Sequence, residues 1–273
     1  MSLPGNYEMQ PTAARPVTDA IYWLWAAGVR FGAAIDVGCA DGWFLLELAE
    51  LGPLRGKPVL NIDAQEDYRD SLAAIQQGIG GHFRICAASD RDGGEMELQV
   101  AVHPYWSSIR PPGDRYWESM HDLRASAARV PLRTLDALAE ETALPGPYLL
   151  KLDVQGAEIE ALRGAPRVLA QTSVLAVESA VEDFQPVHEL VSAAGFDLFD
   201  LCHLCYRDSG ALGWFYPIYV SRRHRGLADA KIWEAGRTGE VIAMQKQHRE
   251  ATRDLLGQSL ARLRAGAWRP IVA

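Results

Sequence analysis

Two segments of this chain constrain its fold most, because each reads as a buried strand that runs into a turn and then a helix. Residues 35–42 read IDVGCADG, and residues 149–158 read LLKLDVQGAE. In the first segment, glycine lets the backbone approach a ligand closely, and the start of the following helix offers unpaired N–H groups. The acids Asp36 and Asp41 suit a ligand with amino and hydroxyl groups better than a pyrophosphate.

Strand patterns alternate with helix patterns along most of the chain. Strands are expected at residues 33–37, 59–63, 83–87, 95–102, 148–154, 173–178, 196–206 and 214–220. Helices are expected at residues 17–30, 43–51, 71–78, 135–141, 156–162 and 187–194. Residues 95–102 are typical of an antiparallel strand, and residues 103–114 indicate an irregular loop. Together these patterns predict the α/β class, with a Rossmann-like, doubly wound, mostly parallel sheet and a terminal antiparallel hairpin.

Three regions follow from this pattern. Residues 1–32 are interpreted as a lead-in and a helix whose cap is Thr18 or Asp19. Residues 33–222 form the main domain, and residues 223–273 form a helical tail. Within the tail, apolar residues recur at helical spacing over 239–266, which predicts a long amphipathic helix or a pair of helices. Such an element packs on its own domain or forms a homodimer.

Composition narrows the class of protein. The net charge of −8 argues against a broad nucleic-acid-binding face, so no nucleic-acid partner is expected. No apolar run is long enough to span a membrane, and the N-terminus lacks the pattern of a signal peptide. We therefore expect a cytoplasmic protein.

Acids end several of the expected parallel strands. Sheets of this kind bind ligands beyond the carboxyl ends of their strands, so we expect these acids to gather along one rim. They are Asp36, Asp63, Asp153 and Glu178. Asp63 follows Gly42 by 21 residues, a position from which a carboxylate can bind ribose hydroxyls. A strand-end cap is the alternative, which the matching spacing of the glycines and acids in the first turn disfavours.

The glycine pattern separates the possible nucleotide ligands. Gly38 and Gly42 are the only glycines of the first turn, so the fingerprint Gly-x-Gly-x-x-Gly of dinucleotide-binding enzymes is missing. A phosphate-binding loop of the Gly-x-x-x-x-Gly-Lys-Ser/Thr type is missing too. These absences disfavour an NAD-dependent oxidoreductase and an NTPase.

At this point the motifs resemble a known family. Residues 36–42 (DVGCADG), 132–136 (LRTLD), 151–158 (KLDVQGAE), 162–165 (LRGA) and 177–178 (VE) are similar to motifs of the FkbM family of class I methyltransferases. The resemblance covers about residues 33–200. The chain departs from the family's usual pattern where Ala40 or Asp41 replaces an Asn, where Asp63-Ala64 replaces Glu-Pro, and where Gln155 replaces an acid.

The resemblance implies S-adenosylmethionine as the cofactor. The residues that it places around this cofactor are Asp36, Gly38, Cys39, Asp41, Gly42, Asp63, Ala64 and Ala88. It also implies methyl transfer, most often to a hydroxyl of a sugar or a natural product, so a small-molecule or glycan acceptor is expected.

Transfer to a hydroxyl requires alignment of the acceptor and removal of its proton. The candidates for the proton acceptor are Asp153 and Glu178, with His203 and His103 as second choices. Alternatively, Asp153 holds the substrate in place, caps the following helix, or binds a divalent metal ion together with Glu178.

Two other functions stay open at this level. One is N-methylation of an amino-sugar or a peptide, because the motifs do not specify the acceptor atom. The other is a cofactor-binding scaffold that no longer catalyses methyl transfer. Gln155, which stands where the family usually has an acid, leaves this loss of activity open.

Overall fold

The computed structural model describes residues 15–119 and 123–227, and the described residues up to Arg225 belong to one compact unit. The strands are β1 Ala33–Val37, β2 Val59–Asp63, β3 His82–Ile85, β4 Ala87–Ala88, β5 Glu95–Ala101, β6 Arg124–Arg133, β7 Tyr148–Leu152, β8 Thr172–Val177, β9 Ser179–Ala180, β10 Phe196–Tyr206 and β11 Leu212–Ser221. The α-helices are α1 Val17–Ala26, α2 Trp43–Leu51, α3 Arg69–Ile79, α4 Arg115–Ser119, α5 Leu135–Thr142, α6 Glu158–Arg163, α7 Pro166–Gln171 and α8 Phe184–Ala193. Short 3-10 helices are η1 Glu66–Tyr68, η2 Pro104–Trp106 and η3 Arg222–Leu227.

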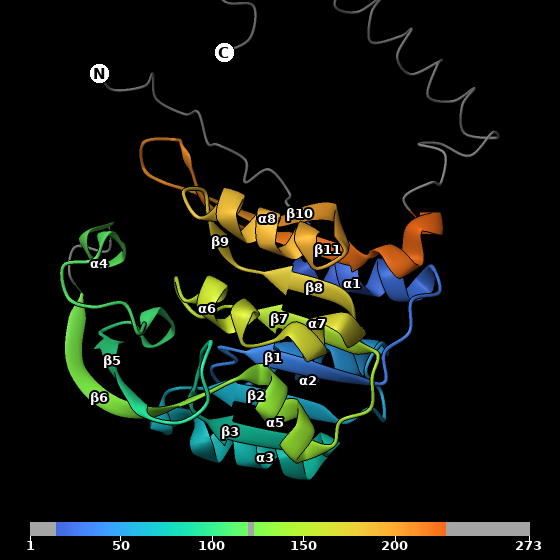
Figure 1. Cartoon of the computed structure of the whole chain (residues 1–273), viewed down its shortest axis with the longest axis horizontal. Coiled ribbons are helices and arrows are strands. Elements are labelled where there is room, and N and C mark those ends of the chain that lie inside the picture. Colours follow the sequence, from blue (N-terminus) through green and yellow to red (C-terminus); the bar gives the residue numbers. More distant parts are fainter. Residues whose placement is uncertain (1–14, 120–122, 228–273) are drawn as a thin grey trace, which may run out of the picture. The chain divides into compact units, whose positions relative to one another are not determined.

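The main sheet has the strand order β10-β11-β8-β7-β1-β2-β3, and β9 pairs with β11. The neighbours from β8 to β3 are parallel, whereas β11 is antiparallel to both β8 and β10. The Rossmann-like α/β fold with a terminal antiparallel hairpin is thereby confirmed (Figure 1). The interior strands β1 and β7 are buried along their whole length, because helices cover both faces of the sheet.

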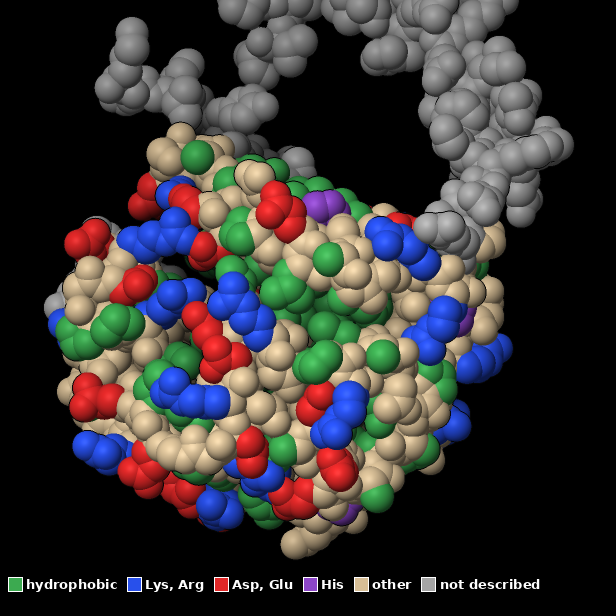
Figure 2. Space-filling model, viewed as in Figure 1, with side chains coloured by type: hydrophobic (Ala, Val, Ile, Leu, Met, Phe, Trp, Pro, Cys, Tyr) green, Lys and Arg blue, Asp and Glu red, His purple; other side chains and the backbone are tan. Residues whose placement is uncertain are grey.

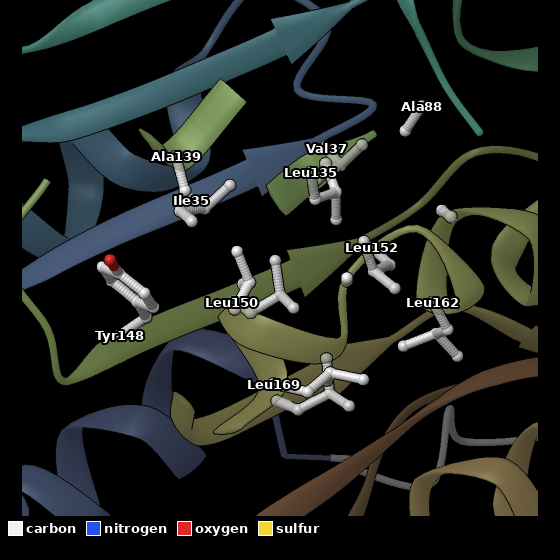
Figure 3. Close-up of a cluster of buried hydrophobic side chains, with 14 of the residues drawn as sticks. Ile35, Val37, Ala88, Leu135, Ala139, Tyr148, Leu150, Leu152, Leu162 and Leu169 are labelled. Atoms are coloured by element: carbon white, nitrogen blue, oxygen red, sulfur yellow. The ribbon is translucent and has the colours of Figure 1, made fainter. Parts of the chain in front are cut away.

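Alternation along the strands divides the core into two layers. Ile35 and Val37 of β1 and Leu150 and Leu152 of β7 pack against α5, α6, α7 and α8 in one apolar cluster (Figure 3). The residues between them, such as Lys151, point to the opposite face, where Phe44 of α2 lies against the Lys151 ammonium group. This division determines which of the strand-end acids can reach a common site.

A second, smaller sheet has the order β4-β6-β5 and projects from the main body with α4 beside it (Figure 1). The expected antiparallel strand at 95–102 is present as β5, and its partner is β6. The sequence pattern does not reveal β6, because residues 125–129 are exposed and lack the apolar alternation of a half-buried strand.

Several element boundaries differ from the sequence-based expectation. Helix α1 ends at Ala26 rather than at residue 30, and Pro16 precedes it with no side-chain cap, so neither Thr18 nor Asp19 is its cap. The third strand stops at Ile85, because residues 87–88 join the small sheet. Helices α4 and α7 were not expected.

Two expectations about the organisation of the chain stay predictions. The predicted helices within 239–266, and with them the proposed homodimer contact, lie outside the described residues. The domain boundaries at 32/33 and 222/223 remain predictions. In the part of the chain that the structure describes, no helix combines the length and apolar character needed to cross a membrane.

Candidate active site

A cavity of about 1070 Å³ lies beyond the carboxyl ends of β1, β2, β7 and β8. Residues of the loop 103–119 and of the β10–β11 hairpin also line it. Figure 2 shows the surface hollowed between the small sheet and the main body, with acidic and basic side chains around the hollow. This position agrees with the rule that open α/β sheets bind ligands at the carboxyl ends of their strands.

The turn after β1 forms one end of this cavity. Gly38 has a φ of 71°, and a Cβ atom there would lie 1.8 Å from the Asp153 carbonyl oxygen, so only glycine fits. Gly42 has a φ of 80° and immediately precedes α2, and a Cβ there would lie 2.6 Å from a methyl carbon of Ile75. Close packing against backbone therefore requires glycine at position 38, whereas the positive φ favours glycine at position 42.

Asp63, at the end of β2, lines the cavity beside this turn. Its Oδ2 accepts a hydrogen bond from the Ala40 N–H at 2.8 Å, and its Oδ1 accepts one from the Gln65 N–H at 2.9 Å. Burial raises the pKa of this carboxyl to about 6, although both backbone bonds act against the rise. A carboxylate has about four acceptor positions, so two remain for hydroxyl groups of a ligand.

Asp36 lies on the other face of the sheet. Its side chain is fully buried, and Oδ1 accepts a hydrogen bond from Lys151 Nζ at 3.1 Å. Burial raises the pKa of Asp36 despite this ion pair, whereas the neighbouring acids raise the pKa of Lys151 against the effect of its own burial. The expected rim of acids therefore holds Asp63, Asp153 and Glu178, but Asp36 lies beneath α2.

The eight residues expected around the cofactor divide into two groups. Gly38, Asp63, Ala64 and Ala88 line the cavity. Asp36, Cys39, Asp41 and Gly42 are not among its lining residues. Asp41 is exposed, and its Oδ1 accepts a hydrogen bond from the Trp43 N–H at 3.3 Å at the start of α2.

A cluster of polar side chains lines the cavity beyond β7 and β8. Asp153 Oδ2 accepts a hydrogen bond from the Tyr216 hydroxyl at 2.5 Å, and Lys151 Nζ lies 3.4 Å from the same oxygen. Gln155 Nε2 donates to Asp153 Oδ1 at 2.7 Å and to Glu178 Oε2 at 2.8 Å. The two carboxyl groups that the sequence singled out thus meet in one hydrogen-bonded cluster.

These two carboxyl groups differ in protonation. Burial favours the neutral form of Asp153, but Lys151 and the surrounding hydrogen bonds outweigh it and hold the pKa of Asp153 below its usual value. Burial and the charge of Asp153 raise the pKa of Glu178 well above its usual value. These opposite shifts favour the ionised form of Asp153 and the protonated form of Glu178, which can then donate a hydrogen bond to Asp153.

The two histidines lie elsewhere. His203, in β10, is exposed and is not a lining residue, and its ring lies 5.8 Å from the ring of Tyr216. His103 stacks on Trp106 at 4.3 Å, and it too lies outside the cavity lining.

Sequence reasoning missed the contributions of Tyr216 and Gln155 to the cluster. Tyr216 lies in β11, whose pairing with β10 contains irregularities of register. The local sequence therefore does not indicate which side chain of β11 reaches the cavity. Lys151 does leave a signal, because it is a charged residue inside an otherwise apolar strand.

A metal ion bound by Asp153 and Glu178 finds no support. No group of three or more His, Cys, Asp or Glu side chains in the described segments is arranged to hold a metal ion. The amide of Gln155 donates to both carboxyl groups, which occupies acceptor positions that a metal ion would need.

Comparison with models of known protein families shows which family this chain belongs to. Residues 36–198 match the methyltransferase FkbM domain. The chain belongs to this family. This match confirms the resemblance of the motifs. FkbM proteins are S-adenosylmethionine-dependent methyltransferases. No curated protein sequence matches the chain.

Several solved structures are similar in fold. An FkbM methyltransferase from Methylobacillus flagellatus has 16% identity and a TM-score of 0.47, and the match covers 74% of this chain and 48% of that one. This chain thus spans about half the length of that protein. A putative tRNA (m1A22) methyltransferase from Streptococcus pneumoniae, in complex with S-adenosyl-L-methionine, has 14% identity and a TM-score of 0.41, with 85% and 87% of the two chains covered. The N-methyltransferase NodS from Bradyrhizobium japonicum, in complex with S-adenosyl-L-homocysteine, has 9% identity and a TM-score of 0.40, with 75% and 85% covered.

Proposed function

We propose that this chain transfers a methyl group from S-adenosylmethionine to a hydroxyl group of a sugar or natural product. The observation that carries the proposal is the Asp153 carboxyl group, whose pKa lies below its usual value, in the cavity that Gly38 and Asp63 also line. One cavity thus combines residues that can bind the cofactor with a carboxyl group that can accept a proton.

All four cysteines carry free thiols, which supports our inference of a cytoplasmic enzyme.

The residues at the first end of the cavity fit the proposed cofactor. Gly38 leaves room for close approach to the backbone, and Asp63 has acceptor positions left for two ribose hydroxyls. The small side chains of Ala64 and Ala88 lie in the same lining and leave space beside it. The negative charge of the cavity is favourable for a cationic sulfonium.

Asp153 is the group that we assign to proton removal. When bound, S-adenosylmethionine supplies an electrophilic methyl group, which the acceptor oxygen takes up. Asp153 receives the proton of the acceptor hydroxyl, which is a general-base role. Its side chain keeps 20% exposure, so an acceptor in the cavity can reach it.

Of the other two catalytic candidates, we assign a supporting role to Glu178 and none to His203. The protonated Glu178 stabilises the ionised form of Asp153 through their shared hydrogen bond. We assign no step to His203, because its exposed ring is not part of the cavity lining.

One observation favours an amine acceptor as a second candidate. The lining contains nine acidic side chains but only three basic ones, which are Arg110, Arg115 and Arg207. Arg115 and Arg207 pair with Asp183 and Glu182. An acidic cavity attracts cations, so N-methylation of an amino-sugar or a cationic peptide is the alternative.

Calorimetric titration with S-adenosylmethionine, S-adenosylhomocysteine and NAD tests the cofactor first. Micromolar binding of the first two without NAD binding is expected. A screen with methyl-labelled cofactor against neutral sugars, polyols and amino-sugars then tests the acceptor. Transfer to amines alone would establish the second candidate, and binding without any transfer would favour a scaffold that has lost turnover.

A further inference from the structure

Gln155 stands between the two carboxyl groups of the cluster. Its single Nε2 group donates to Asp153 at 2.7 Å and to Glu178 at 2.8 Å, which uses both of its hydrogens. Its backbone has a φ of 53°, a left-handed conformation that is uncommon for residues other than glycine. Such strain persists only where surrounding contacts enforce it.

Two residues of the loop 103–119 supply these contacts. The Ser108 hydroxyl donates to the Gln155 carbonyl oxygen at 2.7 Å, and the Ser108 side chain is buried. The Tyr116 hydroxyl lies 3.0 Å from Gln155 Oε1 and 2.7 Å from the Trp106 carbonyl oxygen, so these two acceptors share its single hydrogen. The two carboxyl acceptors require Nε2 on their side of the amide, and the shared hydrogen of Tyr116 supports the same orientation at Oε1.

We propose that Gln155 is a positioning residue for Asp153 and Glu178, and that Ser108 supports its backbone and Tyr116 its Oε1 so that Nε2 donates to both carboxyl groups. This inference rests on the proposed function, in which Asp153 takes the acceptor proton. The amide holds Asp153 Oδ1 while Tyr216 and Lys151 hold Oδ2, so the carboxylate plane has one orientation toward the cavity.

The charges around the pair explain why an amide is suited to this position. The titratable groups that face the pair are Lys151, Asp36, Glu158, Tyr116 and Tyr216. Both tyrosines have pKa values raised well above their usual range by burial, so they are neutral donors. Among the ionisable neighbours only Lys151 is cationic. A carboxylate at position 155 would add another negative charge, whereas the amide adds two donors without charge.

The test compares Gln155→Glu and Gln155→Met with wild type in methyl transfer measured from pH 3 to pH 9, because the pKa of Asp153 lies below its usual value. We expect Gln155→Glu to move the acid limb of the kcat/KM profile upward by about one pH unit or more. Gln155→Met should lower kcat by about tenfold or more and leave the dissociation constant of S-adenosylmethionine within about twofold. Profiles and kcat values equal to wild type in both variants would overturn the proposal.

Gln185→Glu is the matched control. Gln185 makes the same kind of bond, from Nε2 to Glu189 at 3.0 Å, but it lies on exposed α8 and outside the cavity lining. The same change of charge there should leave the pH profile unchanged. Ser108→Ala should reproduce the Gln155→Met effect in weaker form, because it removes the support of the left-handed backbone, together with the acceptor of the Arg110 N–H, but leaves the Gln155 amide in place.

A measurement without turnover separates this inference from the proposed function. Carboxyl-carbon NMR follows the titration of Asp153 and Glu178 in protein labelled at Asp and Glu, with Asp153→Asn and Glu178→Gln to assign the signals. The apparent pKa values belong to the coupled pair, and Gln155→Glu should raise at least one of them by about one unit or more. If no acceptor is methylated, the proposed function fails, and an unshifted NMR titration would separately refute the role of Gln155.

Discussion

At the scale of single residues, Asp63 links cofactor binding to pH. Burial raises its pKa to about 6, and only the ionised form offers all of its oxygen lone pairs to ribose hydroxyls. Binding of S-adenosylmethionine should therefore weaken as pH falls below about 6, by up to about tenfold per unit. Calorimetry from pH 5 to pH 8 checks this, and Asp63→Asn should bind weakly with no pH dependence over that range. Unchanged binding in Asp63→Ala would contradict our placement of the ribose.

Asp153 permits a complementary prediction about turnover. Asp153→Asn keeps the size of the side chain but removes the proton acceptor, so kcat should fall by about 10²-fold to 10⁴-fold. The dissociation constant of S-adenosylmethionine should stay close to wild type, because Asp63 and the Gly38 turn are unaffected. Steady-state kinetics and calorimetry on the same preparation measure both quantities. Full turnover on the true acceptor would exclude Asp153 as the base.

At the scale of elements, Gly164 determines how α6 packs against its neighbours. It ends α6, and a Cβ atom there would lie 2.0 Å from the Ser89 carbonyl oxygen and 3.4 Å from Thr134 Cα. Gly164→Ala must displace backbone, so we expect a loss of about 1–3 kcal/mol in the free energy of unfolding. Urea denaturation measures it.

Gly78 in α3 provides the matched control for this prediction. Nothing lies within 4 Å of a Cβ built there, and the residue is helical. Gly78→Ala should therefore be neutral or stabilise the protein by up to about 1 kcal/mol. Equal destabilisation by both substitutions would show that the close approach at Gly164 is unimportant.

At the scale of the whole molecule, buried carboxyl groups make stability depend on pH. Burial raises the pKa of Glu158 to about 7, although its Oε1 accepts hydrogen bonds from the N–H groups of Val154 and Gly156. The folded protein then binds this proton more tightly than the unfolded chain. The free energy of unfolding should fall as pH rises from about 4.5 to about 7, by up to about 1.4 kcal/mol per unit.

Glu158→Gln tests the source of this pH dependence. Its amide oxygen can still accept both backbone hydrogen bonds, but it has no charge to bury, so the decline should become shallower. Glu50→Gln, on the exposed side of α2, should decline as wild type does. Denaturation of the protein without cofactor at pH 5 and pH 8 compares the three proteins, and a wild-type decline in Glu158→Gln would assign it to other groups.

Much of the fold was predictable from local sequence, and particular elements show why. Strands β1 and β2 and helix α2 have the expected bounds, because each combines a strong apolar pattern with a glycine or an acid at its end. Helix α6 starts at Glu158, two residues later than expected, because Gln155 and Gly156 both have positive φ. Strand β6 escaped prediction because its first half, residues 125–129, is exposed and consists of alanine, serine and arginine.

The sequence by itself determined the α/β fold, the tight turn at Gly38 and the acids at the strand ends, since each depends on near neighbours in the chain. Only the tertiary structure decided which acids share a cavity. Strand alternation and register place Asp36 with Lys151 beneath α2, whereas Asp153 meets Glu178. Gln155 and Tyr216 complete that cluster through the loop 103–119 and the antiparallel strand β11. These contacts join residues far apart in sequence, so the packing of the whole domain establishes them.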